Sequence, residues 1–304
     1  MSDAAPGDLI PGARAHAVSV GSLDFTVHEM GEGPLVLLLH GFPDGPGTWH
    51  LVMPTLAEAG FRCAAVTLRG YEASSRPADS GYRLADLAGD VSGLIAALGE
   101  DRAHLVGHDW GATIAFAAAG GRPDQTLSVS MISVPHPLRF ALAMKDDKAQ
   151  VSRSSYIVFF QLKGLSDWWV GRSCAGFVER LWRKWSPNWT PDPAALADAR
   201  RRLSDRETRR AALDYYRQAL DRSPAAAPSH ALLAGTVQAP TLGLIGSRDA
   251  CIGADIYRAS MQPEDFPGGL RIETLDAGHF PQLEQPRSVA TELLRHLSGS
   301  GRGL

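Results

Sequence analysis

The stretch that decides the fold is Leu105-Val106-Gly107-His108-Asp109-Trp110-Gly111-Ala112. It is typical of a short apolar strand that enters a tight Gly-x-Asp-x-Gly turn and leaves as an Ala-rich helix. The central residue of such a turn has a strained backbone, and small residues two positions before and after it let the strand and the helix approach each other. Gly107 and Gly111 occupy those positions. The pattern predicts a nucleophile elbow that presents Asp109 at the top of a parallel sheet.

A carboxylate at the centre of this turn narrows the chemistry. A serine that attacked a saturated carbon would leave an ether, whereas an aspartate leaves an alkyl ester whose carbonyl water can attack. An aspartate is also ionised at neutral pH without help, because its ordinary pKa is about 4. Asp109 is therefore expected to displace a leaving group at an epoxide or carbon–halogen centre, which keeps a neighbouring base free to activate water.

The composition is that of an ordinary globular protein, with 304 residues, 44% of them hydrophobic and 21% charged. The net charge of -3 argues against a nucleic-acid surface. Cys63, Cys174 and Cys251 show no metal-type spacing, and an odd number gives no disulfide framework, so we predict reduced thiols. Residues 1–14 have no apolar core and are expected to be a mobile start, neither a signal peptide nor an anchor. We expect a cytoplasmic protein with no membrane partner, and a homodimer stays open.

Apolar runs and helical periodicity alternate along most of the chain, which predicts an α/β fold with a doubly wound, mostly parallel sheet. Two alternating segments joined at Gly21-Ser22 predict an N-terminal antiparallel hairpin. Besides the strand of the elbow, strands are predicted over residues 15–20, 23–28, 34–39, 62–68, 127–134, 240–246 and 270–275. Helices are predicted over residues 49–59 and 84–98, after the elbow, and from residue 286 onward.

The alternation stops between residues 137 and 229, where no apolar strand run occurs. This segment is rich in tryptophan and begins helices such as the one at Asp192-Pro193. It predicts an inserted helical cap over residues 137–229, between core segments 1–136 and 230–304. The tryptophans suit either the packing of the cap or contacts with a bulky substrate. Six arginines within residues 200–210 alternate with acidic residues, which indicates a solvated helix face rather than a polyanion site.

Two further polar residues follow predicted strands, where open α/β sheets place their functional groups. Asp249 comes after one of these strands and His279 after the next. The order nucleophile, acid, histidine is that of a hydrolase triad, in which the acid orients an imidazole that takes a proton from water. We therefore predict a triad of Asp109, Asp249 and His279, with Asp276 as the competing acid.

The oxyanion that forms when water attacks an Asp109 ester needs backbone donors. The N–H groups of Trp110 and Phe42 are expected to supply them. Pro43 stiffens the loop that holds Phe42 but has no N–H of its own. Trp110, Phe42 and Pro43 are also expected to contact the substrate. We expect neither a metal nor a cofactor.

Four motifs together resemble the epoxide hydrolase branch of the α/β-hydrolase superfamily. They are His40-Gly41-Phe42-Pro43-Asp44, Arg69-Gly70-Tyr71, Gly107-His108-Asp109-Trp110-Gly111 and Gly278-His279-Phe280. The resemblance covers nearly the whole chain and implies the α/β-hydrolase fold, with an inserted helical cap and a small apolar epoxide as substrate. It implies an alkyl ester on Asp109 that water opens to a vicinal diol. Glu72 stands where the family usually has Gly, which leaves the conformation of that loop open.

Caps of this family carry two tyrosines whose hydroxyls bind and protonate the epoxide oxygen. Tyr156, in Tyr156-Ile157-Val158-Phe159-Phe160-Gln161, resembles the first of them. Tyr216, in Asp214-Tyr215-Tyr216-Arg217, resembles the second, and Tyr215 is its alternative because neighbouring helix positions point in different directions.

Two other functions remain open from the sequence. Sister haloalkane dehalogenases share the Asp nucleophile and often the Trp after it, and their halide needs weak donors such as an indole N–H. A haloalkane or haloacid dehalogenase is thus the runner-up, although a haloacid enzyme would want a cation where Trp110 stands. A hydrolase-like binding protein with a silent site is the alternative of another class, and the intact triad argues against it.

Overall fold

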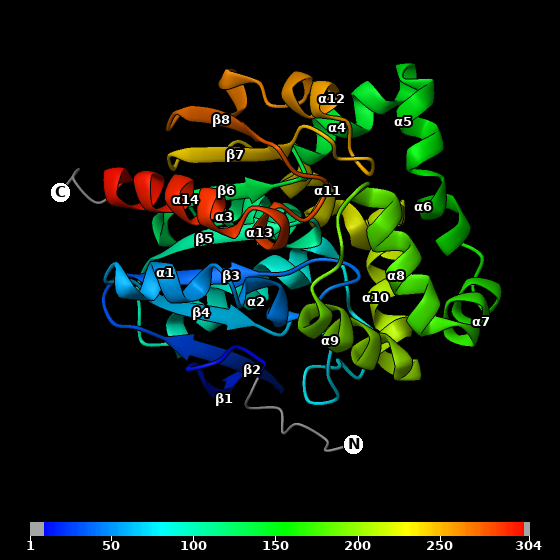
Figure 1. Cartoon of the computed structure of the whole chain (residues 1–304), viewed down its shortest axis with the longest axis horizontal. Coiled ribbons are helices and arrows are strands. Elements are labelled where there is room, and N and C mark those ends of the chain that lie inside the picture. Colours follow the sequence, from blue (N-terminus) through cyan, green and yellow to red (C-terminus); the bar gives the residue numbers. More distant parts are fainter. Residues whose placement is uncertain (1–8, 301–304) are drawn as a thin grey trace.

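A β-sheet forms the centre of the fold (Figure 1). The computed structural model describes residues 9–300, and within them the sheet has eight strands in the order β1-β2-β4-β3-β5-β6-β7-β8. The predictions made for residues 1–8 and 301–304 lie outside the described residues. The strands are β1 (Arg14–Val20), β2 (Leu23–Met30), β3 (Leu35–Leu39), β4 (Arg62–Val66), β5 (Ala103–His108), β6 (Thr126–Ile132), β7 (Thr241–Gly246) and β8 (Leu270–Leu275).

Only the first edge of the sheet is antiparallel. β1 and β2 form a hairpin in which Val20 lies opposite Leu23, and β2 runs antiparallel to β4. All pairings from β4 through β8 are parallel. Every residue of β3 and β5 is buried, as expected for strands covered on both faces. The mostly parallel sheet with an N-terminal antiparallel hairpin is therefore confirmed.

Helices cover both faces of the sheet. Figure 1 shows α1, α13 and α14 in front of it and α2 and α3 behind it. Alternate residues of β3 point to the two sides: Leu37 packs in the core beneath α2 and α3, and Leu38 in the core beneath α1 and α14. The helices outside the segment between β6 and β7 are α1 (Met53–Glu58), α2 (Leu84–Ala97), α3 (Trp110–Gly121), α12 (Ala254–Ala259), α13 (Pro281–Glu284) and α14 (Pro286–Ser300).

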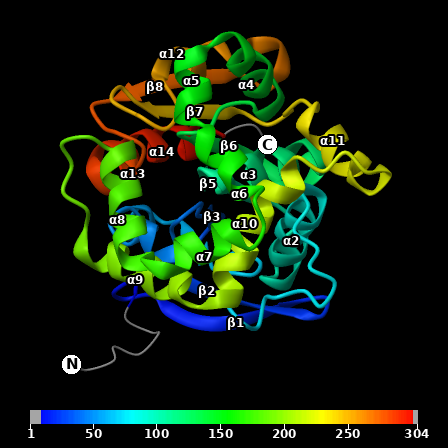
Figure 2. The same cartoon turned by 90° about the vertical axis from the view of Figure 1, so that its right-hand side faces the viewer.

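Between β6 and β7 the chain is helical, as the sequence predicts. Figure 2 looks onto these helices and shows α6, α7, α8 and α10 in front of the sheet. They are α4 (Pro137–Ala143), α5 (Lys148–Arg153), α6 (Ser155–Phe160), α7 (Leu165–Arg172), α8 (Cys174–Trp185), α9 (Pro193–Ser204), α10 (Arg206–Ala219) and α11 (Ala227–Leu233). The last of them, α11, packs against α2 and α3 of the core. The limits of the cap at residues 137 and 229 remain a prediction.

The single helix predicted over residues 49–59 is wrong. A 3-10 turn at Pro46–Trp49 comes first, and α1 begins only at Met53. Pro54 explains the late start, because proline lacks an N–H and is tolerated only in the first turn of a helix. Within residues 9–300, none of the helices combines the length and apolar character needed to cross a bilayer.

The cysteines and two of the five tryptophans predicted in the cap contribute to packing. Cys63, Cys174 and Cys251 are buried and free. Trp182 and Trp185 are fully buried in the core that joins the cap to the sheet. These two tryptophans therefore pack the cap and are not available to contact a substrate.

Candidate active site

Asp109 occupies a strained turn between β5 and α3. Its φ of 54° and ψ of -119° lie outside the regions that ordinary side chains favour. A Cβ atom on Gly107 would lie 2.1 Å from the carbonyl oxygen of Gly111, and one on Gly111 would lie 2.0 Å from that of Leu39. Positions 107 and 111 must therefore both be glycine for β5 and α3 to meet at this turn.

Asp249 is the acid that contacts the histidine. It lies in the turn after β7, where its Oδ1 accepts the N–H groups of Cys251 at 2.7 Å and Ile252 at 2.9 Å. Its Oδ2 lies 2.8 Å from Nδ1 of His279, which follows β8. The competing Asp276 is 75% exposed and pairs with Arg248 at the surface. The structure thus brings Asp249, and not Asp276, to the imidazole.

The imidazole of His279 lies between two carboxylates, because its Nε2 is also 3.5 Å from Oδ2 of Asp109. Burial lowers the pKa of His279, but the negative charges of Asp249 and Asp109 outweigh burial and raise this pKa to about 10. Burial raises the pKa of Asp109. The contact with His279 lowers this pKa by more, so the net value lies below the ordinary value of the carboxyl. At neutral pH the site holds an imidazolium between two carboxylates.

One of the two expected oxyanion donors contacts Asp109. The N–H of Phe42 donates to Oδ1 of Asp109 at 2.8 Å. A Cβ atom on Gly41 would lie 2.4 Å from Cβ of Asp109, so the glycine lets this loop approach. The Phe42–Pro43 peptide bond is cis. In the described part of the chain the N–H of Trp110 makes no hydrogen bond to the Asp109 side chain, and its role stays a prediction.

The two predicted tyrosines lie together. Tyr156 comes from α6 and Tyr216 from α10, and their ring centroids are 5.7 Å apart. The hydroxyl of Tyr216 is buried and has no hydrogen-bond partner within residues 9–300, while that of Tyr156 lies 3.7 Å from Sγ of Cys251. Burial raises the pKa of both phenols well above the ordinary value, so both keep their protons.

Tyr215 points elsewhere. Its hydroxyl donates to the carbonyl oxygen of Arg69 at 2.8 Å, so its proton is already engaged. Its ring packs edge-on against those of Tyr71 and Trp110. The geometry favours Tyr216 over Tyr215 as the second hydroxyl at the nucleophile.

A cavity of about 240 Å³ opens onto Asp109, Trp110, Tyr156 and Tyr216. The rest of its lining is mainly apolar and includes Leu84, Val134, Phe140, Met144, Ile157, Leu233 and Ile252. Phe42 and Pro43 do not line it; the Phe42 ring is buried 5.4 Å from that of Tyr216. Contact of these two residues with a substrate remains a prediction. In residues 9–300 no group of three or more His, Cys, Asp or Glu side chains is placed to hold a metal ion.

Three side chains that were not predicted from the sequence hold the His279 loop. The carbonyl oxygen of His279 accepts Oγ–H of Ser133 at 2.9 Å and contacts Nε2 of His108 at 2.8 Å. The N–H of His279 donates to Oγ of Ser186 at 2.9 Å. His108 is part of the elbow motif, but Ser133 and Ser186 lie far away in sequence, so no local signal could identify them.

The fold and this arrangement of Asp109, Asp249 and His279 are those of an α/β hydrolase with a carboxylate at the elbow. The family model described as alpha/beta hydrolase fold matches residues 34–286. An epoxide hydrolase of Caballeronia sordidicola is 30% identical over 95% of both chains, and epoxide hydrolase A of Mycobacterium tuberculosis is 31% identical over 93% of this chain and 96% of the relative.

The solved structure of an epoxide hydrolase from an endophytic Streptomyces superposes with a TM-score of 0.76 at 29% identity, covering 95% of this chain and 96% of that one. The chain belongs to the α/β-hydrolase fold family and, within it, to the epoxide hydrolase branch. The resemblance inferred from the four motifs is thereby confirmed.

Proposed function

We propose that this protein hydrolyses an epoxide to a vicinal diol through an alkyl ester on Asp109. The observation that carries the proposal is the meeting of an elbow carboxylate with two tyrosine side chains, Tyr156 and Tyr216, in one mainly apolar cavity. Membership of the epoxide hydrolase branch supports the overall reaction, and the similar proteins from Caballeronia sordidicola and Mycobacterium tuberculosis carry that name.

Ring opening uses the two oxygens of Asp109 differently. Oδ1 accepts the N–H of Phe42 at 2.8 Å, whereas Oδ2 makes only the longer 3.5 Å contact with Nε2 of His279, so Oδ2 is the oxygen that attacks an epoxide carbon. The bond between that carbon and the epoxide oxygen breaks as the ester bond forms. The oxygen leaves as an alkoxide and takes a proton from Tyr156 or Tyr216, whose pKa values stay high enough to keep that proton until it is needed.

Ester formation switches the state of His279. The alkylated Asp109 no longer carries a negative charge, so one of the two carboxylates that raise the pKa of His279 disappears. The imidazolium of His279 then donates its proton to the tyrosinate and becomes neutral. A neutral His279, still oriented by Asp249, is able to take a proton from water.

Hydrolysis completes the cycle. The activated water attacks the ester carbonyl, and the N–H of Phe42 stabilises the oxyanion, with Trp110 as the second expected donor. The acyl C–O bond breaks, and the leaving alkoxide takes the proton of the hydroxyl that was added to the carbonyl carbon, which releases the diol and restores the Asp109 carboxylate. The proton that His279 took from water remains on the imidazole. Protons balance, because both tyrosines and the ion pair end as they began.

The cavity defines a class of substrate. Besides Asp109, its lining offers the hydroxyls of the tyrosines and a majority of apolar side chains, so a small neutral apolar epoxide fits it. The buried cap tryptophans do not add to this surface. The cytoplasmic location and the homodimer remain predictions.

Trapping the ester tests the proposal. We expect His279→Gln, incubated with aryl and alkyl epoxides, to gain the whole mass of the epoxide on the peptide that contains Asp109, whereas Asp109→Asn/His279→Gln gains none. An adduct formed only from haloalkanes, with loss of halide, would assign the protein to the dehalogenases. No adduct in a folded His279→Gln variant, with diol formed by the wild type, would contradict the ester.

A second measurement uses the unmodified enzyme. Over repeated turnovers in isotopically labelled water, one carboxylate oxygen of Asp109 should become labelled, because the attacking water stays on the carboxyl carbon. Diol formation without label in Asp109 would show direct attack of water on the epoxide. A protein that makes no diol from any epoxide and forms no adduct would be the silent binding protein.

A further inference from the structure

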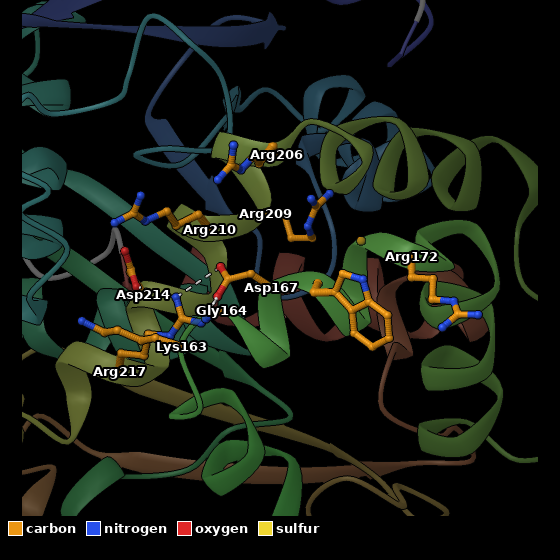
Figure 3. Close-up of a pocket in the computed structure, with 11 residues that line it drawn as sticks. Lys163, Gly164, Asp167, Arg172, Arg206, Arg209, Arg210, Asp214 and Arg217 are labelled. Atoms are coloured by element: carbon orange, nitrogen blue, oxygen red, sulfur yellow. Dashed lines mark hydrogen bonds and ion pairs between the residues drawn. The ribbon is translucent and has the colours of Figure 1, made fainter.

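The outer face of the cap carries a second hollow, separate from the cavity of Asp109. It has a volume of about 460 Å³ and lies where the end of α6 and helix α7 meet α10 (Figure 3). Six cationic side chains line it against two carboxylates, those of Asp167 and Asp214. The cationic residues are Lys163, Arg172, Arg206, Arg209, Arg210 and Arg217.

The arginines predicted to lie on a solvated helix face fall into two groups. The arginines of α9 are paired as predicted: Arg201 and Arg202 with Asp198, and Arg200 with Glu179. Those of α10 instead line the hollow. The difference arises because Asp198 serves the arginines of α9, and Asp205 accepts the N–H of Thr208 at the start of α10.

The two carboxylates of the hollow are already engaged by one arginine. Arg217 donates to Oδ2 of Asp167 at 2.6 Å and to Oδ1 of Asp214 at 2.8 Å, and its Nε donates to the carbonyl oxygen of Phe160 at 2.9 Å. Its side chain is 5% exposed, so it forms a fixed floor. Figure 3 shows Asp167 pointing toward Arg217.

In the part of the chain that the structure describes, the other cationic side chains of the hollow have no carboxylate as close to them as Asp167 and Asp214 are to Arg217. Within residues 9–300 Lys163, Arg172 and Arg210 make no ion pair, and Arg206 has only a 3.9 Å contact with Glu207 at the surface. They therefore leave a surplus of positive charge around a concave surface.

Arg209 is positioned rather than mobile. Its Nη1 donates to the carbonyl oxygens of Leu203 at 2.8 Å and Ser204 at 3.2 Å, and its Nε is buried with no partner in the described part of the chain. A Cβ atom on Gly171 would lie 2.7 Å from this guanidinium, so the glycine lets Arg209 lie against α7. Such packing argues against an ordinary solvated arginine.

An apolar ring completes the hollow. Trp168 lines it with 53% of its surface exposed, and Cζ of Arg172 lies 5.1 Å from the centre of that ring. An exposed indole next to arginine offers a stacking surface for an organic group attached to an anion.

We propose that this hollow binds a phosphate group, carried by a small organic molecule or by a lipid headgroup. Arginine forks match the geometry of phosphate oxygens, and several unpaired cations suit a multivalent anion better than a single carboxylate. The volume is sufficient for a phosphate with an organic substituent. The proposal is independent of the reaction at Asp109, because the two cavities share no lining residue.

Binding of inorganic pyrophosphate tests whether the hollow binds the phosphate group of a small soluble molecule. At ionic strength held constant with NaCl, we expect saturable heat in a calorimetric titration and a rise in Tm for the wild type. Arg206→Gln/Arg210→Gln should bind at least tenfold more weakly. Both side chains are exposed, so folding should be retained. Arg183→Gln/Arg287→Gln, which removes the same charge from exposed positions outside the hollow, is the matched control and should bind like the wild type.

Vesicles test the lipid source. Sedimentation with vesicles of phosphatidylcholine, with and without phosphatidic acid, should show binding only with the acidic lipid, again weakened in Arg206→Gln/Arg210→Gln and not in the control. Saturable binding of either probe that depends on the hollow supports the proposal. If neither probe binds, or if the control pair loses as much affinity as the pocket pair, the charge is a general surface property and the proposal is wrong.

Discussion

The Nε2 atom of His279 lies 3.5 Å from Oδ2 of Asp109, and both side chains are almost completely removed from solvent. Two groups that are meant to act in succession therefore hold each other in their charged forms before any substrate arrives. The attraction keeps Asp109 ionised, as the proposed attack requires, and in the proposed mechanism it keeps His279 protonated until the charge on Asp109 is consumed. In the proposed mechanism, this ion pair therefore sets the order of the two chemical steps.

This ion pair should make stability depend on pH. The pKa of His279 is raised to about 10 in the folded protein, against about 6.5 in the unfolded chain. Its stabilising contribution is complete below pH 6.5 and is lost as the pH rises through 10, by at most about 1.4 kcal/mol per pH unit. Urea unfolding of wild type and His279→Gln at several pH values should show their difference in free energy shrinking over this window.

The control for that measurement is His230→Gln, which removes an exposed imidazole that contacts neither carboxylate. Its difference from the wild type should stay constant between pH 6.5 and 10. A difference between wild type and His279→Gln that is equally flat would mean that His279 is not held protonated by Asp109 and Asp249.

The tyrosine hydroxyls should matter for ring opening rather than for folding. Tyr156→Phe and Tyr216→Phe each remove one donor, and we expect the rate of ester formation to fall by about 10²-fold or more in each, with a larger loss in the double variant. Single-turnover mass spectrometry of each variant in the His279→Gln background measures this step directly. Substrates with an acidic leaving group should be less affected, because their oxygen needs less help from a proton donor.

Tyr215→Phe is the matched control, since its hydroxyl donates to the carbonyl oxygen of Arg69. It should lose about 1 kcal/mol of stability and keep most of its rate of ester formation. Should Tyr215→Phe lose the rate while Tyr216→Phe keeps it, the assignment of the second donor would have to be exchanged.

The two glycine positions of the elbow, Gly107 and Gly111, should tolerate no side chain. In Gly111→Ala the new Cβ would lie 2.0 Å from the carbonyl oxygen of Leu39, which belongs to the central strand and cannot retreat. We expect a loss of about 3 kcal/mol or more in the free energy of unfolding, measured by urea titration. Gly89→Ala, within α2 and with no atom within 4 Å of the new Cβ, should instead be neutral or stabilising by up to about 1 kcal/mol.

The residues that meet at Asp109 could be predicted from the sequence because local patterns place them. A strand that ends in a tight turn fixes where Asp109 lies, and the parallel sheet brings the turns after β7 and β8 to the same edge. Contacts that cross between the cap and the core have no such local signal. Ser186, in the cap, accepts the N–H of His279 across 93 positions of sequence.

Charge pairing also depends on geometry that spacing does not determine. The arginines of α9 and α10 occupy one alternating run in the sequence, yet the carboxylate of Asp198 serves Arg201 and Arg202 of α9, while α10 faces a hollow whose acids are bound to Arg217. Helical phase separates the two groups, and only the packing of α7 on α10 shows where each guanidinium lies.

Glu72 shows how a departure from the family pattern is accommodated. The positive φ of its loop falls at Gly70, at 78°, and not at position 72, so the backbone there does not require glycine. The carboxylate of Glu72 instead accepts the N–H of Thr26 at 2.7 Å and the Oγ–H of Thr26 at 2.6 Å. Thr26 lies on β2 just before the pairing of that strand with β4 begins at Val27. Its carbonyl oxygen accepts the N–H of Thr67 at 2.9 Å, and Glu72 supplies the partner for its N–H.

Removing this carboxylate should loosen the loop that follows β4. We expect Glu72→Ala to lose about 2 kcal/mol in the free energy of unfolding, because two hydrogen bonds to a charged acceptor disappear and the N–H of Thr26 loses its partner. Glu72→Gln keeps one acceptor oxygen and should lose about half as much. Urea unfolding measures both, with Glu32→Ala, an exposed carboxylate, as the control. If Glu72→Ala were as stable as Glu32→Ala, Thr26 would have to find its partner in solvent, and the loop would owe its conformation to Gly70 alone.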